Sequence, residues 1–273
     1  MIDELIAKAR SLGPIPVSVV HADDEFAIAG AREAERLGLM TAVFDATPDM
    51  AAKRAASGEV AAIMKGTLHS DVLLHAVLRE PALHRGRRLS HVVIAQLAHR
   101  ATPLLVSDAA VNISPDLDTK REIVQNAIDV AHSLGIEQPR VAILSAVETI
   151  ASAIPSTIDA AALTEMAARG QITGGIVDGP LALDDAVSVE AARAKGIHSP
   201  AAGNADILIA PDLDAGNIIY KALERLAHAR CGGVVVGAAV PMILTSRADS
   251  IDARVISTAV TRLIVDDRRE QFP

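Results

Sequence analysis

Residues 61–78 read AAIMKGTLHSDVLLHAVL and contain the pattern that decides the fold. The run Ala61–Met64 is short and wholly apolar, which is typical of a strand buried on both faces. Lys65–Ser70 is a small, polar stretch, and Asp71–Leu78 has the apolar spacing of a helix. A strand, a polar loop and a helix in this order make the first part of a βαβ unit.

The same alternation of strand and helix continues along the chain, which predicts an α/β fold with a mainly parallel sheet and helices on its faces. Further strands are predicted at Pro16–Val20, Met40–Phe44, His91–Gln96, Leu104–Val106, Arg140–Leu144, Gly174–Val177, Ile207–Ile209, Gly233–Val236 and Met242–Leu244. Further helices are predicted at Glu25–Leu37, Lys120–Leu134, Thr157–Arg169, Ala182–Lys195 and Gly216–Ala229.

The composition excludes several classes of protein. The 273 residues include 51 alanines but only one Tyr, three Phe and no Trp, so the core must be aliphatic and closely packed. Few aromatic rings and a net charge of −8 argue against nucleic acid as a partner, because such binding uses stacking and positive charge. No apolar run reaches the length of a membrane-spanning helix, so no membrane partner is expected.

Cysteine, histidine and the amino-terminal segment add further limits. Cys231 is the single cysteine, which rules out an intramolecular disulfide framework and a site of several thiolates. The nine histidines lack the spacing of zinc ligands, so they are interpreted as surface or capping residues, and no metal is expected. The first residues read as an amphipathic helix without a secretory signal, which predicts a cytoplasmic protein.

Small polar residues follow the predicted strands. In open parallel sheets, ligands bind outside the carboxyl ends of the strands, so these loops are expected to surround one cleft. The candidate substrate-binding residues in these loops are Lys65, Gly66, His69, Ser107, Asp108, Asn112, Asp178 and Thr245.

The loop after Met242–Leu244 carries the most chemistry. The hydroxyls of Thr245 and Ser246, the guanidinium of Arg247 and a following helix N-terminus together suit a phosphate. In the alternative interpretation, Arg247 pairs with an aspartate on a solvated turn. Lys65 offers a second cation, but the sequence has neither a Walker A loop nor a G-x-G-x-x-G motif. A dinucleotide cofactor is therefore unsupported.

Eight collinear segments lie between residues 64 and 250, and they read MKGTLHSDVLL, RRLSHV, SDAAVNISPDL, LSAVE, PSTIDAAALTEMAARGQITGG, VDGPLALDDAVS, KGIHSPAAGNADILIAPDLDAGN and PMILTSRADS. Taken together, these segments resemble the phosphate acetyl/butyryltransferase family. The TSRADS form, together with Lys65 and Gly66, is most similar to the butyryl-type branch and to the transferase portion of hydratase–transferase fusions.

The resemblance implies a two-domain fold like that of isocitrate and isopropylmalate dehydrogenases, with the active-site cleft between the domains. The first domain would comprise residues 1–100 and 238–273, and the second residues 101–237. Homodimers or larger homo-oligomers are expected, as is usual in the family.

The resemblance also implies a reaction, in which an acyl group, from acetyl to butyryl, moves reversibly between coenzyme A and inorganic phosphate. Coenzyme A is then a substrate, and no permanently bound cofactor is implied. Ser246 and Arg247 match the family's Ser-Arg pair, which binds the phosphoryl-bearing substrate. The family's acetyl branch has an aspartate seven residues after the serine, where this chain has Ala253. Asp252, one residue away, is the candidate for the base that deprotonates the thiol.

Two other functions stay open at this point. Asp178 and Asp212, which follow predicted strands, suit a metal- and NAD-dependent decarboxylating dehydrogenase on the same fold. The alanine at position 253 suits a non-catalytic sensor that binds acyl-CoA and has lost the base.

Overall fold

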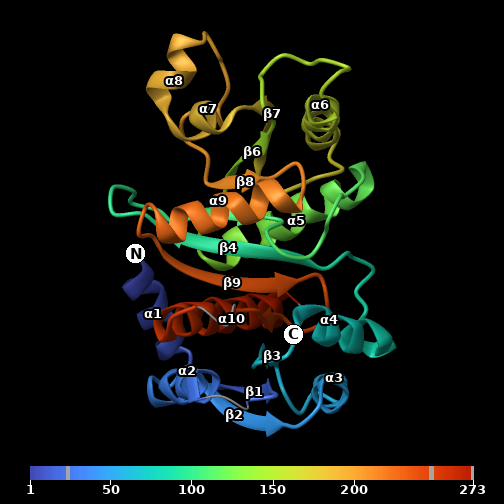
Figure 1. The fold of residues 1–273 in the computed structure, drawn as a ribbon, viewed down its shortest axis with the longest axis vertical. Coiled ribbons are helices and arrows are strands. Elements are labelled where there is room, and N and C mark those ends of the chain that lie inside the picture. The colour runs from blue at the N-terminus through green and yellow to red at the C-terminus, as the bar shows by residue number, and fades with distance from the viewer. Residues whose placement is uncertain (23–24, 246–248, 272–273) are drawn as a thin grey trace. The chain divides into compact units, whose positions relative to one another are not determined.

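The computed structural model describes residues 1–22, 25–245 and 249–271 (Figure 1). It contains helices and mainly parallel strands, which confirms the predicted α/β class. The chain divides into two compact units. Unit 1 contains Met1–Leu89 and Arg230–Pro273, and unit 2 contains Ser90–Ala229. None of the described helices is long and apolar enough to cross a membrane.

Unit 1 has the strand order β2-β1-β3-β10-β9, in which the first four strands are parallel and β9 is antiparallel to β10. Its helices are α1 (Ile2–Ser11), α2 (Glu25–Arg36), α3 (Pro48–Ala56), α4 (Ser70–Arg79), the 3₁₀ turn η1 (Pro81–Leu83) and α10 (Ile251–Gln271). Its strands are β1 (Ile15–Val20), β2 (Met40–Asp45), β3 (Ala62–Lys65), β9 (Arg230–Val236) and β10 (Met242–Ile243).

Small side chains explain how helices pack closely on this sheet. In α2, Ala31 and Ala34 are fully buried against the core formed by Val17, Val19 and Met64. Methyl groups at these positions let a helix approach the strands closely, and the strands are buried on both faces. Helix α2 connects β1 to β2, and α3 connects β2 to β3, so the two connections run in opposite directions along the sheet. Because such connections between parallel strands are right-handed, the two helices lie on opposite faces of the sheet.

Unit 2 has the strand order β4-β5-β8-β6-β7, in which β4 is antiparallel to β5 and the other four strands are parallel. Its strands are β4 (Ser90–Gln96), β5 (Leu104–Ser107), β6 (Arg140–Leu144), β7 (Ile176–Leu181) and β8 (Ile207–Ile209). Its helices are α5 (Leu117–Ser133), α6 (Pro155–Ala168), α7 (Leu183–Val187), α8 (Val189–Ala194) and α9 (Leu213–Arg225).

The bounds of the two units differ from those of the predicted domains at β4 and β9. The predicted domains assign β4 to the first domain and β9 to the second. In the structure β4 lies in unit 2, where it pairs with β5, and β9 lies in unit 1, where it pairs with β10. The predicted domain bounds stay a prediction.

Two local predictions were wrong. Asp178 was placed in a loop after a strand, but it lies inside β7, opposite Ala142 of β6. β7 is at the edge of the strand order, where a sheet tolerates the proline at position 180. The single helix predicted at Ala182–Lys195 is two short helices, because Ser188 ends α7 and caps α8 by accepting the Ala191 N–H at 3.2 Å.

Candidate active site

The carboxyl ends of β1, β3 and β10 lie at one edge of the sheet of unit 1, because these strands are parallel. The register pairs Met242 with Ile63 and Ile243 with Met64. Gly66 directly follows the end of β3, and Thr245 lies two residues beyond the end of β10. Two of the predicted loops therefore begin next to each other.

Lys65 ends β3, and its side chain is buried, with 4% exposure. The ammonium donates hydrogen bonds to the backbone carbonyls of Gly66, at 3.3 Å, and Leu68, at 3.2 Å. These bonds hold the ammonium at the end of the strand, where it is placed to attract an anion. His69, by contrast, is exposed at the N-cap of α4 and makes no capping bond with its side chain.

Gly66 allows two backbone segments to approach each other. A Cβ at this position would lie 2.2 Å from the carbonyl oxygen of His21 and 2.4 Å from that of Val20. The Gly66 N–H donates to the Val20 carbonyl at 2.8 Å, and the Thr67 hydroxyl donates to the His21 carbonyl, also at 2.8 Å. The loop after β3 is thus fastened to the end of β1, which fixes its shape.

Thr245 is buried, with 2% exposure, and its hydroxyl oxygen has no hydrogen-bond partner among the described residues. A buried hydroxyl normally has one, so Thr245 has bonding capacity left for a ligand. Ser246 and Arg247, the predicted catalytic pair, lie outside the described residues. The chain is described again from Asp249, and Ser250 caps α10 by accepting the Ala253 N–H at 3.1 Å.

Asp252 lies in the first turn of α10, and both of its carboxylate oxygens are bound by one guanidinium. Arg230 donates to them at 2.9 Å and 2.8 Å, and also to Asp3 at 2.8 Å. The hydrogen bond with Asp252, followed by the one with Asp3, raises the pKa of Arg230. A thiol that uses Asp252 as its base must therefore compete with this ion pair.

In unit 2, Ser107, Asp108 and Asn112 come together at the carboxyl end of β5. The Asp108 carboxylate accepts the backbone N–H groups of Ala110 (2.9 Å), Val111 (3.0 Å) and Asn112 (3.1 Å), and the Asn112 amide at 2.5 Å. Four donors use most of the acceptor capacity of one carboxylate, so Asp108 shapes its own loop. The Ser107 hydroxyl is buried and has no hydrogen-bond partner within the described part of the chain.

Helix α9 closes this loop from the other side. Gly216 lies against the loop, since a Cβ there would be 2.0 Å from the Asp108 carbonyl oxygen. The Asn217 amide donates to the Ala109 carbonyl at 3.1 Å. Asp212 caps α9 by accepting the Ala215 N–H at 2.9 Å. The sequence predicts a helix from Gly216, but it does not show that Gly216 and Asn217 fasten the loop after β5.

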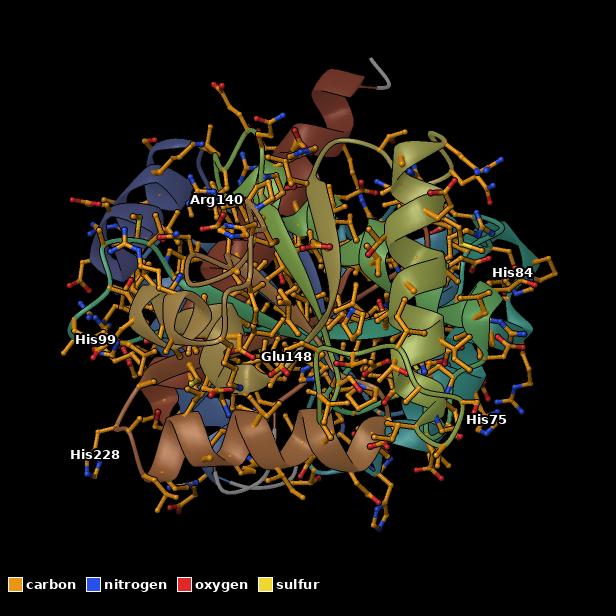
Figure 2. All side chains as sticks on the ribbon, turned by 90° about the horizontal axis from the view of Figure 1, so that it is seen from above. His75, His84, His99, Arg140, Glu148 and His228 are labelled. Carbon is orange, nitrogen blue, oxygen red and sulfur yellow. The ribbon has the colours of Figure 1, made fainter. Side chains whose placement is uncertain are left out.

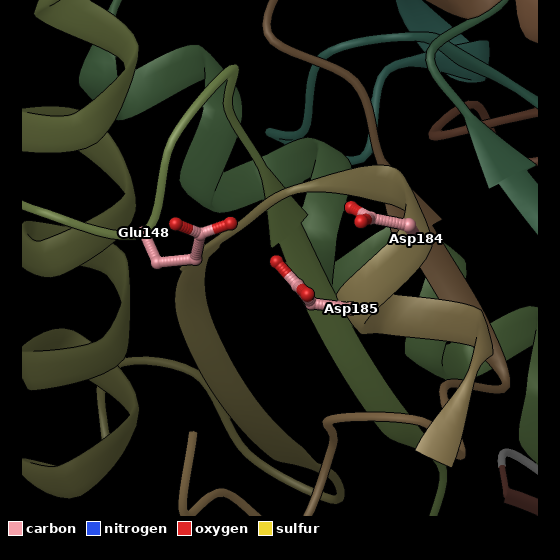
Figure 3. A group of neighbouring side chains, drawn as sticks. All are labelled: Glu148, Asp184 and Asp185. Atoms are coloured by element: carbon pink, nitrogen blue, oxygen red, sulfur yellow. The ribbon is translucent and has the colours of Figure 1, made fainter. Parts of the chain in front are cut away.

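Three carboxylates, from Glu148, Asp184 and Asp185, have oxygen atoms within 4.8 Å of one another (Figure 3). Lys195 lies among them, with its ammonium 2.8 Å from Glu148, 3.1 Å from Asp184 and 3.0 Å from Asp185. Lys195 is therefore the cation that the three acids share. None of these residues was among the predicted site residues, because they come from separate segments of the chain.

Burial and hydrogen bonds shift the pKa values of two acids in this cluster in opposite directions. The Asp185 side chain is fully buried, and burial is the main cause that raises its pKa. The hydrogen bond with Asp185, followed by the one with Lys195, lowers the pKa of Glu148 to about 2. The dehydrogenase alternative relied instead on Asp178 and Asp212, which are not in this cluster and have the structural positions given above.

The positions of the histidines test the interpretation that they are surface or capping residues. His75, His84, His99 and His228 are exposed, and Figure 2 shows their side chains pointing outward. The acidic cluster found among the described residues contains no histidine. These four side chains have the surface positions that the sequence predicted. The prediction was wrong for His91, which lies in β4 and is buried among the strands, with 3% exposure.

By its architecture the protein belongs to the α/β class, in which ligands typically bind at the carboxyl edge of the parallel strands. Residues 37–262 match the sequence profile described as phosphate acetyl/butaryl transferase. The chain belongs to this family, and it is an acyltransferase.

Two named relatives and one solved structure are similar over nearly the whole chain. A phosphate acetyltransferase of Rhizobium meliloti is 46% identical over 98% of this chain and 94% of its own length. A phosphate butyryltransferase of Clostridium acetobutylicum is 36% identical over 97% of this chain and 98% of its own length. The crystal structure of a branched-chain phosphotransacylase from Enterococcus faecalis matches with a TM-score of 0.81. The match covers 92% of this chain and 99% of that chain, with 32% sequence identity.

Proposed function

We propose that the protein transfers a short acyl group reversibly between coenzyme A and inorganic phosphate at the strand-end site of unit 1. The observation that carries the site is the position of Lys65, Gly66 and Thr245 at adjacent strand ends, immediately before Ser246 and Arg247 in the sequence. A buried ammonium and a buried hydroxyl with free bonding capacity suit a phosphate oxygen.

The reaction needs stabilisation of negative charge more than it needs covalent catalysis. A phosphate oxygen attacks the thioester carbonyl, an oxyanion forms, and its collapse releases the CoA thiolate and leaves an acyl phosphate. We assign Arg247 to neutralising the phosphate and the oxyanion, and Ser246 to donating a hydrogen bond to them. Binding both substrates in line then accounts for much of the acceleration.

The reverse direction needs a thiolate, which attacks the acyl phosphate and displaces phosphate. A thiol has an ordinary pKa of about 8.5, so only modest assistance is required. Asp252 remains our candidate for this base, and the thiol would then take the place of Arg230 as its partner. The alternative is that the thiol ionises without a dedicated base, which the ion pair between Asp252 and Arg230 favours.

The remaining predicted residues receive different roles. We assign Ser107, Asn112 and His69 to substrate contacts, and Asp108 to the shape of its loop. Asp178 stays in the proposal only as a residue of β7. The likeness to isocitrate and isopropylmalate dehydrogenases, the homodimer, the cytoplasmic location and the absence of a permanent cofactor also remain proposals.

The experiment is an assay of acyl phosphate formation from acetyl-, propionyl- and butyryl-CoA with phosphate, in both directions. Turnover with at least one thioester is expected, and the ratio of kcat/KM values gives the acyl preference. Calorimetric binding of CoA without turnover would instead support the non-catalytic sensor. If the protein shows neither binding nor turnover with any of the three thioesters, the proposal is overturned.

A further inference from the structure

Arg254 is a buried arginine in the first turn of α10, with 2% exposure. Its side chain passes over Gly30 of α2. A Cβ at position 30 would lie 2.2 Å from Cδ of Arg254, so any larger residue there would displace the arginine. The absence of a side chain at Gly30 therefore makes the space in which Arg254 lies.

The guanidinium of Arg254 reaches the end of β3. Its Nη1 donates to the backbone carbonyl of Lys65 at 3.5 Å. Lys65 in turn holds its ammonium against the carbonyls of Gly66 and Leu68. Arg254 thus connects the start of α10 to the residue that offers its ammonium to the phosphate.

The two cations lie at the same strand end, and both are buried. Burying a guanidinium is unfavourable, and an apolar side chain of similar volume would often be as stable or more stable there. An anion bound at this strand end would be attracted by both positive charges.

We propose that Arg254 is a positioning residue of the phosphate site, which holds the Lys65 strand end in place and adds buried positive charge beneath the anion. The inference rests on the proposed function, because that function makes phosphate the anion at this site. It predicts that Arg254 affects the binding of phosphate more than the binding of acyl-CoA.

Arg262, two turns further along α10, is a matched control. It is also buried, with 4% exposure, and its guanidinium also binds backbone carbonyls, those of Leu12 and Gly13, both at 2.7 Å. These carbonyls precede β1, so they lie at the amino end of that strand. Loss of Arg262 removes a comparable buried arginine from the edge of the sheet opposite the proposed site.

The experiment compares the wild type with Arg254→Met, Arg254→Lys, Gly30→Ala and Arg262→Met. For each protein, KM and kcat are measured with phosphate and acetyl-CoA, phosphate binding is measured by calorimetry, and Tm is recorded. Arg254→Met should raise both the KM and the Kd for phosphate by about tenfold, the size of one charged hydrogen bond. The KM for acetyl-CoA should change less than about twofold, since that ligand keeps its contacts.

The other variants separate positioning from folding. Arg254→Lys should restore part of the phosphate affinity, and Gly30→Ala should weaken phosphate binding because it displaces Arg254. Arg262→Met should lower Tm and leave the Kd for phosphate unchanged. If Arg254→Met does not fold, the inference is tested by comparing the Kd for phosphate of Arg254→Lys and Gly30→Ala with that of Arg262→Met.

Two results would overturn the inference. One is an unchanged Kd for phosphate in the folded Arg254 and Gly30 variants. The other is an equal loss of phosphate affinity in Arg262→Met, which would make the effect one of general stability. A failure of the proposed function would appear earlier, as a wild type that neither turns over acyl-CoA nor binds phosphate.

Discussion

At the scale of single residues, Gly66 shows how one missing side chain can set the shape of a site. The carbonyls of Val20 and His21 occupy the space that a Cβ would need, and the Gly66 N–H bonds to one of them. The approach of these two loops therefore depends on glycine. This is a stricter requirement than that of most turn glycines, which serve backbone conformation alone.

Gly66→Ala should lower the stability of the protein and its activity together. The new methyl group meets backbone oxygens at 2.2 Å and 2.4 Å, and backbone cannot turn away as a side chain can. We expect a loss of about 1–3 kcal/mol in the free energy of unfolding, the range for overpacked sites. Urea unfolding gives this value. Thr67→Val is the comparison, because it replaces the hydroxyl with a methyl group and removes one hydrogen bond to the His21 carbonyl without placing a group against the backbone of β1. A fully stable and active Gly66→Ala would contradict the close approach.

Arg247→Ala should reduce kcat/KM by about 100- to 1000-fold, the loss that follows removal of an oxyanion contact worth about 3–4 kcal/mol. The variant should keep the Tm of the wild type if the residue serves the reaction and not the fold. The initial rate of acyl phosphate formation measures the effect. Equal rates in the variant and the wild type would remove Arg247 from the mechanism.

Sequence could predict the candidate residues that directly follow buried strands. Lys65, Gly66 and Thr245 belong to this group, because a strand's end fixes where the next side chains lie. Sequence could not reveal that the Asp108 carboxylate is bound by its own loop, or that Asp252 is paired with Arg230. Both depend on partners whose distance becomes known only in the folded chain.

At the scale of elements, the helices α7 and α8 are joined to the loop after β6 by charge. Lys195, at the C-cap of α8, contacts Asp184 and Asp185 of α7 and Glu148 of the loop. The four residues come from three separate segments, so no local pattern predicts their contact. The break at Ser188 escaped prediction for another reason, because the segment has helical composition on both sides of the cap.

Lys195→Met should loosen the α7 and α8 segment. The substitution leaves the buried Asp185 without its ammonium partner, which costs about 1–3 kcal/mol for an unsatisfied buried group. Hydrogen exchange should rise in residues 183–196 before it rises in the strands. The double variant Lys195→Met, Asp185→Asn should recover part of the loss, and an equal loss in both would speak against the pairing.

The acidic cluster should also make stability depend on pH. Because the pKa of Glu148 is lowered from 4.5 to about 2, its contribution is complete above 4.5 and is lost as the pH falls toward 2. The raised pKa of Asp185 acts in the opposite sense, since its contribution is lost as the pH rises. Glu148→Gln should therefore destabilise the protein clearly at pH 6 and much less near pH 2. Unfolding by urea at both pH values tests this, and a constant difference would contradict it.

At the scale of the whole molecule, the shortage of aromatic residues and the abundance of alanine determine how the core is built. The core cluster of unit 1 has methyl groups where α2 meets the strands. A core of this kind has little space for larger side chains, because close packing leaves few voids. The sequence composition predicted this property, but not which alanines lie at the contact.

Ala31→Leu should therefore be destabilising by about 1–3 kcal/mol, although leucine is the more hydrophobic residue. Ala31 is fully buried in α2, and the added carbon atoms have to displace neighbouring strands or helices. Ala7→Leu, at an exposed position of α1, should stay within about 0.5 kcal/mol of the wild type. Chemical denaturation of both variants is the measurement, and equal stabilities would contradict a tightly filled core.

Arg230 has a practical consequence for handling this protein. It binds Asp3 near the amino terminus and Asp252 at the start of α10, so a change at the first helix reaches the helix that follows Ser246 and Arg247. An affinity tag fused to the amino terminus would place extra residues beside this contact. A tag at the carboxyl terminus leaves it untouched, and is the better choice for kinetic work.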